Sequence, residues 1–542
     1  MALIKRVGRL AFVTVLALTT LEGLVRVTYG VRNAFVTHVP LPYVIGHDYG
    51  PTPPWLEDLL ILAPDSSLIW RNRPNLSRRY VDIFQPVRTD DERRALFRAF
   101  LPPSAESWKD YPEWEIRLND EGYRARGPIG PKRPSSVRIV CLGDSWTFGM
   151  NVSDDETYPA RLERLLRREL PGLDVEVLNL GLLGYSSHQG LALMKSRVLG
   201  LEPDVVLLGF AMNDAKLAGY RDKDRAVYAA QPSVRKSVSD LMARSEVLRL
   251  LQYLALMVRH RPQTIGYYLQ REAEAAKAAA GGQRFDELEP WTRVSLKDYE
   301  HNMREMIRLV RSRAAEVVLL YNELWENGPY RDVLRRLAQE EKVPFLDSNA
   351  VILGARRKVE AELERTLGLV PAAEHEPGSA EDEVEVVFRV YVGTLPVPKA
   401  LYIAGPYPQL GSLVPNNVAL YDDGTHGDQR ARDGVWTYAA WFRPGTTVYY
   451  VYTNSGAEGR WAGLDVPHIR EFSVETAPTQ RRLYRPIESF GKIYLQADSW
   501  HPDRTGYGLI AEELLQILQR NATFRERAMR ASETASTAGG KR

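Results

Sequence analysis

The sequence predicts an α/β fold on a parallel sheet, with an all-β unit inserted into it and a helix at the N-terminus. Three observations predict this arrangement. Strands and helices alternate from Val137 onward, which is typical of a parallel sheet with helices on both faces. Between residues 380 and 475, strand-like runs separated by Gly/Pro turns replace that pattern. Three cations followed by a short apolar run open the chain.

Length and composition limit the classes of protein to consider. The chain has 542 residues, which at about 100–200 residues per domain predicts two to four domains. Apolar residues make up 44% and charged residues 26%, which excludes a wholly disordered, collagen-like or multi-span membrane protein. The 71 Lys+Arg and 69 Asp+Glu leave a net charge of +2, so no nucleic-acid partner is expected. The one cysteine, Cys141, cannot form an internal disulfide or build a zinc site.

Residues 1–30 are predicted to form a signal-anchor, a transmembrane segment that stays attached. Lys5, Arg6 and Arg9 precede an apolar run that extends to Val25, and no small-x-small cleavage site follows it. A cleaved signal and a buried N-terminal helix are the alternatives, because the run is shorter than the roughly 20 residues of a membrane span. The anchor would keep the cations in the cytoplasm and make the membrane a partner. The rest of the chain would then be extracytoplasmic, on a periplasmic or cell-surface face.

Short apolar runs and amphipathic stretches predict one α/β domain in two parts, residues 136–371 and 476–522. The predicted strands are Val137–Leu142, Val175–Leu178, Asp204–Leu208, Glu316–Tyr321 and Val343–Leu346. The predicted helices are Thr157–Leu170, Ser186–Leu199, Tyr299–Arg313, Tyr330–Gln339 and Thr505–Arg520.

The remaining segments surround or interrupt this domain. Residues 31–135, rich in Pro, Trp and Arg, are predicted to be an N-terminal extension packed on it. Residues 215–296 are predicted to be a helical insertion, either a packed hairpin or a lid over the active site. Residues 372–475 are predicted to be the inserted β-sandwich, preceded by a linker over 369–382. The polar tail 523–542 is predicted to be disordered.

Four short blocks carry residues suited to nucleophilic catalysis. Ser145 ends a Gly-Asp-Ser tripeptide after the first strand, at the sheet edge where open α/β folds bind ligands. Gly181 follows the second strand and lets a backbone N–H approach a substrate. Asn213 follows the third strand, and its amide can donate to a developing oxyanion. Asp498 and His501 are three residues apart, so the carboxylate can hold the imidazole while its other nitrogen takes the serine proton.

In this order, the four blocks resemble the SGNH/GDSL hydrolase family, which is named for Ser, Gly, Asn and His. The resemblance implies a flavodoxin-like three-layer α/β/α fold and an esterase or acyl-hydrolase activity. It implies Ser145 as nucleophile, His501 as general base and Asp498 as its orienting carboxylate. It also implies an oxyanion hole formed by Ser145, Gly181 and Asn213.

The implied reaction is acyl transfer from an ester to Ser145 and then to water, with no cofactor required. Another alcohol in place of water would make the enzyme a transferase. Asp144 is interpreted as a helix cap rather than as a member of the triad.

The β unit contains a cluster of four Asp residues in a Gly-rich loop. Its carboxylates can supply oxygen ligands for Ca²⁺, or they can form Asx turns between strands. These residues are Asp422, Asp423, Asp428 and Asp433.

As a whole the β unit resembles, more loosely, the Ig-like carbohydrate-binding domains joined to polysaccharide-active enzymes. Four aromatic residues can stack on sugar rings or can pack in the core. They are Trp436, Trp441, Tyr450 and Trp461.

These observations together predict a serine esterase that removes an O-acyl group, such as acetyl, from a carbohydrate or a related ester. The partner would be an ester-bearing small molecule or polysaccharide. The alternatives are a polysaccharide O-acyltransferase with the same triad and a catalytically inactive glycan-binding protein.

Overall fold

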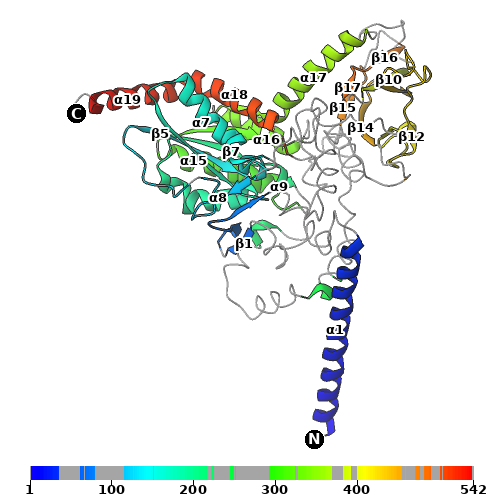
Figure 1. Ribbon diagram of the computed structural model, residues 1–542, viewed down its shortest axis with the longest axis horizontal. Coiled ribbons are helices and arrows are strands. Elements are labelled where there is room, and N and C mark those ends of the chain that lie inside the picture. The colour runs from blue at the N-terminus through cyan, green and yellow to red at the C-terminus, as the bar shows by residue number, and fades with distance from the viewer. Residues whose placement is uncertain are drawn as a thin grey trace.

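The fold is described from a computed structural model of the chain (Figure 1). The residues with a described placement are 2–35, 62–65, 67–79, 115–125, 127–150, 152–215, 221–224, 245–248, 251, 292–323, 328–368, 383–391, 400–453, 458, 470–475, 481–489, 501–502 and 504–539.

The central element is a five-stranded parallel sheet. Its strands are β5 (Ser136–Gly143), β6 (Asp174–Gly181), β7 (Val205–Gly209), β8 (Glu316–Tyr321) and β9 (Phe345–Asp347). They stand in the order β6-β5-β7-β8-β9, which in chain order is the flavodoxin-like order 2-1-3-4-5. Gly143 pairs with both Gly181 and Gly209, so the first three strands end at the same level. The predicted α/β fold on a parallel sheet is confirmed.

Helices cover both faces of this sheet (Figure 1). Their bounds are α7 (Tyr158–Glu169), α8 (Ser187–Ser196), α15 (Leu296–Arg311), α16 (Pro329–Glu340), α17 (Ser348–Leu367) and α18 (Arg504–Arg520). α8, α15 and α16 pack in one layer, whereas α7 and α17 both contact α18. In α7, Tyr158, Leu162 and Leu166 recur every four residues and are buried on the sheet, which gives the helix its apolar face.

The described parts of the N-terminal extension pack on the α/β domain. They contain two antiparallel pairs, β1 (Leu62–Asp65) with β2 (Ile69–Asn72) and β3 (Ser77–Arg79) with β4 (Glu115–Arg117). Apolar side chains from these strands and their flanks, including Leu68, Trp70 and Ile116, belong to the same buried core as the sheet.

The chain begins with a long helix, α1 (Ala2–Phe35). Its Glu22 accepts hydrogen bonds from the backbone N–H groups of Glu246 and Val247, at 2.9 and 3.1 Å. Among the residues with a described placement, no helix combines the length and the apolar character that crossing a membrane requires. The predicted signal-anchor, and with it the membrane as a partner, is therefore not supported. The extracytoplasmic location stays a prediction.

The C-terminal tail differs from the prediction. Residues 523–542 were expected to be disordered because they are polar, but α19 spans Ala522–Gly539. Asn521 caps this helix through a 2.8 Å bond from the Phe524 N–H to its side-chain oxygen. Phe524 is fully buried in the main core, and Arg527 pairs with Asp204 at 2.8 Å. These contacts of Phe524 and Arg527 with the α/β domain stabilise the helix, and the polar composition of the tail did not indicate them.

Two four-stranded sheets form the all-β unit. One contains β10 (Val384–Tyr391), β13 (Val435–Phe442), β16 (Arg482–Tyr484) and β17 (Glu488–Ser489); the other contains β11 (Tyr402–Ala404), β12 (Val418–Ala419), β14 (Thr447–Thr453) and β15 (Arg470–Ser473). A separate apolar cluster that includes Phe388, Phe442 and Tyr450 fills this unit. The predicted all-β insertion is therefore seen in part, but an Ig-like topology is not confirmed. β16 and β17 pair in parallel with β10, so the unit extends past the predicted boundary at residue 475.

The helical insertion 215–296 and the linker 369–382 lie mostly or wholly outside the described residues.

Candidate active site

Ser145 lies directly after β5, on a single turn of helix. This helix, α6 (Ser145–Phe148), ends at Gly149, which adopts a left-handed φ of 85°. Asp144 caps its first turn by accepting a 3.0 Å hydrogen bond from the Trp146 N–H, so its predicted role as a helix cap is confirmed. The turn places Ser145 at the carboxyl edge of the sheet, as the strand pattern predicted.

His501 meets Ser145 across 356 residues of sequence. Its Nε2 lies 2.7 Å from the Ser145 Oγ, and each residue is only 5% exposed. A serine hydroxyl at this distance from an imidazole nitrogen can transfer its proton to the ring. The fold therefore brings together the nucleophile and the base that the sequence proposed. Asp498, the predicted orienting carboxylate, lies outside the described residues.

Asn213 lies in the short helix α9 (Met212–Ala215), which follows β7. Its Nδ2 donates to the Asp144 Oδ2 at 3.3 Å, and both side chains are buried. One N–H of the amide is thus held by Asp144, which leaves the second for a substrate oxygen. Burial raises the pKa of the Asp144 carboxyl to about 7, although hydrogen bonds from Trp146 and Asn213 and the nearby His501 oppose this rise.

Gly181 has a different local role from the one expected of an oxyanion donor. Its N–H donates to the side-chain oxygen of Asn179 at 3.0 Å. A Cβ at this position would lie 2.1 Å from the backbone N of Phe148, so glycine is needed for close packing under α6.

Gly184, three residues further along, is a second candidate for the backbone donor. It has a φ of +71°, and its N–H makes no hydrogen bond within the described part of the chain. The sequence analysis named only Gly181; the Gly-x-x-Gly spacing over 181–184 is the signal that could have indicated the second glycine.

Part of the chain is similar to a known protein family. Residues 141–366 match the model of the GDSL-like Lipase/Acylhydrolase family. The protein is an ester-hydrolysing enzyme. The GDSL match ends before the β unit and before His501, so the pairing of this base with Ser145 is seen only in the structure.

Similar solved structures include a catalytic mutant of an acetylxylan esterase from Geobacillus stearothermophilus. It is 17% identical, with 45% of this chain and 85% of that chain covered and a TM-score of 0.23. Another is the lipase/acylhydrolase from Enterococcus faecalis, 16% identical, with 40% and 78% covered and a TM-score of 0.23. The comparison with curated protein sequences gives no match.

Arg124, which the sequence did not single out, supports the nucleophile turn. It comes from the N-terminal extension and is buried. Its Nη1 donates to the carbonyl oxygens of Phe148 and Gly149, at 3.0 and 2.5 Å, and its Nε pairs with Asp154 at 2.7 Å. Because α6 has a single turn, no helical N–H follows to bond the carbonyls of Phe148 and Gly149, and Arg124 donates to both.

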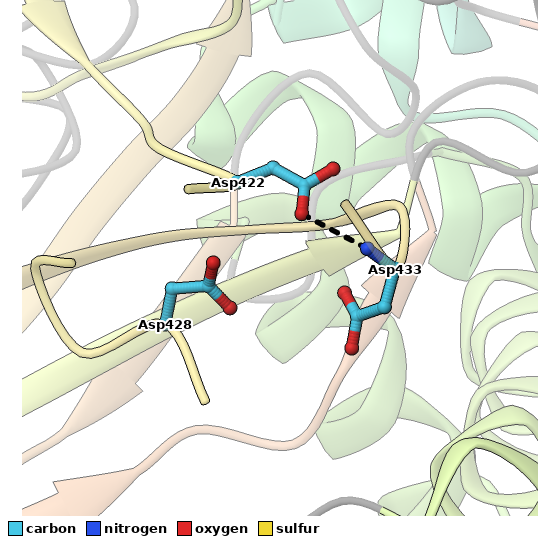
Figure 2. Close-up of side chains that lie close together, drawn as sticks. All are labelled: Asp422, Asp428 and Asp433. Atoms are coloured by element: carbon cyan, nitrogen blue, oxygen red, sulfur yellow. Dashed lines mark hydrogen bonds between the residues drawn. The ribbon is translucent and has the colours of Figure 1, made fainter. Parts of the chain in front are cut away.

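The acidic loop of the β unit brings three of its four carboxylates together (Figure 2). Carboxylate oxygens of Asp422, Asp428 and Asp433 lie within 4.8 Å of one another. Burial raises the pKa values of Asp422 and Asp433, and the charge of Asp433 contributes to the rise at Asp422. No residue of the described part of the chain makes a hydrogen bond to the Asp433 Oδ2. This oxygen-rich grouping has the donor chemistry that Ca²⁺ prefers.

The same loop also contains the predicted Asx turns. Asp423, Asp428 and Asp433 each accept a hydrogen bond from the backbone N–H two residues on, at 2.9–3.1 Å. Asp423 lies outside the three-carboxylate group, so it is not a ligand candidate. Calcium binding stays a prediction.

The four aromatic residues predicted to bind sugar have different environments. Tyr450 is buried, and its hydroxyl donates to Glu488 at 2.7 Å, so its ring is a core element rather than a sugar platform. Trp436 is partly buried against the core of the β unit. Trp441 is 47% exposed on β13, and its predicted contact with sugar stays a prediction. Trp461 lies outside the described residues.

Proposed function

We propose that this protein is a serine esterase that hydrolyses O-acyl esters through an acyl-Ser145 intermediate. The observation that carries the proposal is the 2.7 Å contact between the Ser145 Oγ and the His501 Nε2 in a buried setting. Neither residue needs to move to begin proton transfer.

The first half of the reaction acylates the serine. The Ser145 oxygen attacks the ester carbonyl carbon while its proton passes to the His501 Nε2, and the carbonyl oxygen becomes an oxyanion. The free N–H of the Asn213 amide and backbone N–H groups beside Ser145 stabilise that charge. When the C–O bond of the ester breaks, the alcohol leaves with the proton from His501. Asp498 is proposed to hold the imidazole in the required tautomer.

The second half releases the acid. Water loses a proton to His501 and attacks the acyl carbon, and the Ser145 oxygen leaves and recovers the proton. Both halves use the same donors, so one site serves both steps.

The proposed substrate is an O-acyl group, such as acetyl, on a carbohydrate. The exposed Trp441 supports the carbohydrate part, because an indole face outside the core provides a surface for stacking on a sugar ring. The family match supports the acyl-ester part.

The test compares the full chain with Ser145→Ala on short and long acyl esters and on acetylated polysaccharides. Ser136→Ala is the matched control, since Ser136 is a buried serine at the opposite end of β5. We expect Ser145→Ala to abolish acid release and Ser136→Ala to retain it. Activity that survives in Ser145→Ala would overturn the proposal.

Adding an acceptor sugar separates hydrolysis from transfer. A hydrolase releases the same amount of acid with or without the acceptor and forms no acylated sugar. Transfer of the acyl group to the acceptor would instead identify the O-acyltransferase. An inactive glycan-binding protein would release no acid and would be insensitive to Ser145→Ala.

A further inference from the structure

Two buried donors from other segments hold the loop that follows β6. The Trp70 Nε1 on β2 donates to the carbonyl oxygen of Leu183 at 3.0 Å. The Arg293 Nη1, from the end of the helical insertion, donates to the carbonyl oxygen of Gly184 at 2.7 Å. Two successive carbonyls of one loop are therefore fixed by side chains 113 and 109 residues away.

Arg293 is itself held in place. Its Nε and Nη2 donate to the two carboxylate oxygens of Asp222, at 3.1 and 2.8 Å, and Asp222 is fully buried. Its guanidinium carbon lies 5.2 Å from the centroid of the Trp70 ring, within the range of a cation–π contact. A bidentate pair between buried groups has little freedom, so the Nη1 keeps its direction toward the loop.

The fixed carbonyls determine where a neighbouring N–H points. The Leu183 C=O and the Gly184 N–H belong to one planar trans peptide unit, so they point in opposite directions. With Trp70 on the carbonyl side, the Gly184 N–H is directed away from Trp70.

Three of the other N–H groups of this loop donate within the protein, whereas that of Leu183, like that of Gly184, has no acceptor among the described residues. The N–H groups of Gly181, Leu182 and Tyr185 donate to Asn179, Gly143 and Leu182.

We propose that Trp70 and Arg293 are positioning residues for the acyl-transfer reaction. They orient the Leu183–Gly184 peptide unit so that its N–H donates to the oxyanion formed at Ser145. Neither side chain touches the substrate; each acts through the loop. This inference rests on the proposed function.

The test uses Trp70→Phe and Arg293→Lys in the full chain. Phenylalanine keeps an aromatic ring but removes the donor to Leu183, and lysine keeps the charge beside Asp222 but loses the forked geometry. Arg197→Lys is the matched control, because Arg197 makes a comparable two-bond pair with Glu121, at 2.6 Å, that does not contact the loop.

Each variant is assayed on an activated acetyl ester and on its thionoester, in which sulfur replaces the carbonyl oxygen. Hydrogen-bond donors aimed at a developing O⁻ favour the oxygen ester, so the ratio of the two kcat/KM values reports on the oxyanion donors. A variant that only lowers the folded fraction reduces both values equally and leaves the ratio unchanged.

We expect Trp70→Phe and Arg293→Lys to lower kcat for the oxygen ester by about 10- to 100-fold, the range for a misplaced reacting group. KM should stay within about threefold of the wild-type value, because the hydrogen bond from the Gly184 N–H strengthens only in the transition state. For the same reason the ratio of kcat/KM for the oxygen ester to kcat/KM for the thionoester should fall together with kcat. Arg197→Lys should keep both. If Arg293→Lys fails to fold, Trp70→Phe decides alone.

An unchanged ratio in Trp70→Phe would overturn the inference, even if kcat falls. This outcome differs from a failure of the proposed function, in which Ser145→Ala would still release acid. If Ser145→Ala is inactive while Trp70→Phe keeps the wild-type ratio, the esterase mechanism stands and the positioning role does not.

Discussion

Replacing Asp144 by Asn tests whether burial of this carboxyl costs the folded state free energy. The side chain lies between the nucleophile turn and Asn213, with a pKa raised to about 7 from 3.8. Each pH unit between the two values is worth about 1.4 kcal/mol, so the ionised carboxyl costs the folded state about 4 kcal/mol above pH 7.

The sign of the pH dependence follows from the raised pKa. Well below pH 3.8 the carboxyl is protonated in both states, so its ionisation has no effect on stability. As the pH rises to about 7, the unfolded chain ionises first and the folded state loses stability. Asparagine does not ionise and caps a helix as well as aspartate, so Asp144→Asn avoids this loss.

Urea unfolding of wild type and Asp144→Asn, followed by tryptophan fluorescence, measures the difference. The stability of the variant relative to wild type should increase by about 3 kcal/mol between pH 5 and pH 8.5. Asp423→Asn is the control, because Asp423 is exposed and its pKa is lowered, mainly by its hydrogen bond from Thr425. Its difference from wild type should be the same at both pH values. A difference for Asp144→Asn that also stays constant would show that His501 and the hydrogen bonds keep this carboxylate ionised at no cost.

Three further predictions concern the oxyanion donors, the packing of Gly181 and the acidic loop. Asn213→Ala should lower kcat by about 10²–10³-fold with a small change in KM, measured by steady-state kinetics on an acetyl ester. An unchanged kcat would show that Asn213 is not an oxyanion donor. Gly181→Ala places a Cβ 2.1 Å from the Phe148 backbone N, so the Tm of this variant should fall by an amount equivalent to about 1–3 kcal/mol or more. Gly200→Ala is the control and should retain the wild-type Tm, because a Cβ at Gly200 would have no neighbouring atom within 4 Å. Ca²⁺ should raise the Tm of the β unit in scanning calorimetry, and EDTA should reverse the rise. The rise should be smaller at low pH, where Asp422 and Asp433 are protonated. If Ca²⁺ does not shift the Tm, the loop's carboxylates serve only as Asx turns.

The parallel sheet was predictable because its strands are buried on both faces. β7, for example, is buried along its whole length and appears in the sequence as an uninterrupted apolar run. Helix α17 was not predicted, because charged residues interrupt its apolar spacing. Two of them, Arg356 and Glu360, are buried as an ion pair at 2.9 Å, and several others are exposed. The contacts that order α19 come from elsewhere in the chain, so its polar composition suggested disorder.

The reactive residues were predictable for a topological reason. Ser145 and Asn213 follow neighbouring parallel strands, and the carboxyl ends of such strands share one edge of the sheet. The residues that hold the site were not predictable in this way. Trp70 and Arg124 lie in a region with little periodicity, and each acts through hydrogen bonds to carbonyls far along the chain.

These supporting contacts have a common physical cause. A nucleophile on a one-turn helix gains mobility unless its terminal groups are bonded from outside, because four residues supply few intrahelical hydrogen bonds. Asp144 bonds the start of α6 and Arg124 its end, while Trp70 fixes the facing loop. Two of these three groups come from the N-terminal extension. The extension is therefore part of the scaffold that keeps the nucleophile and the oxyanion donors in register, and the α/β domain without it would lose the bonds from Arg124 and Trp70.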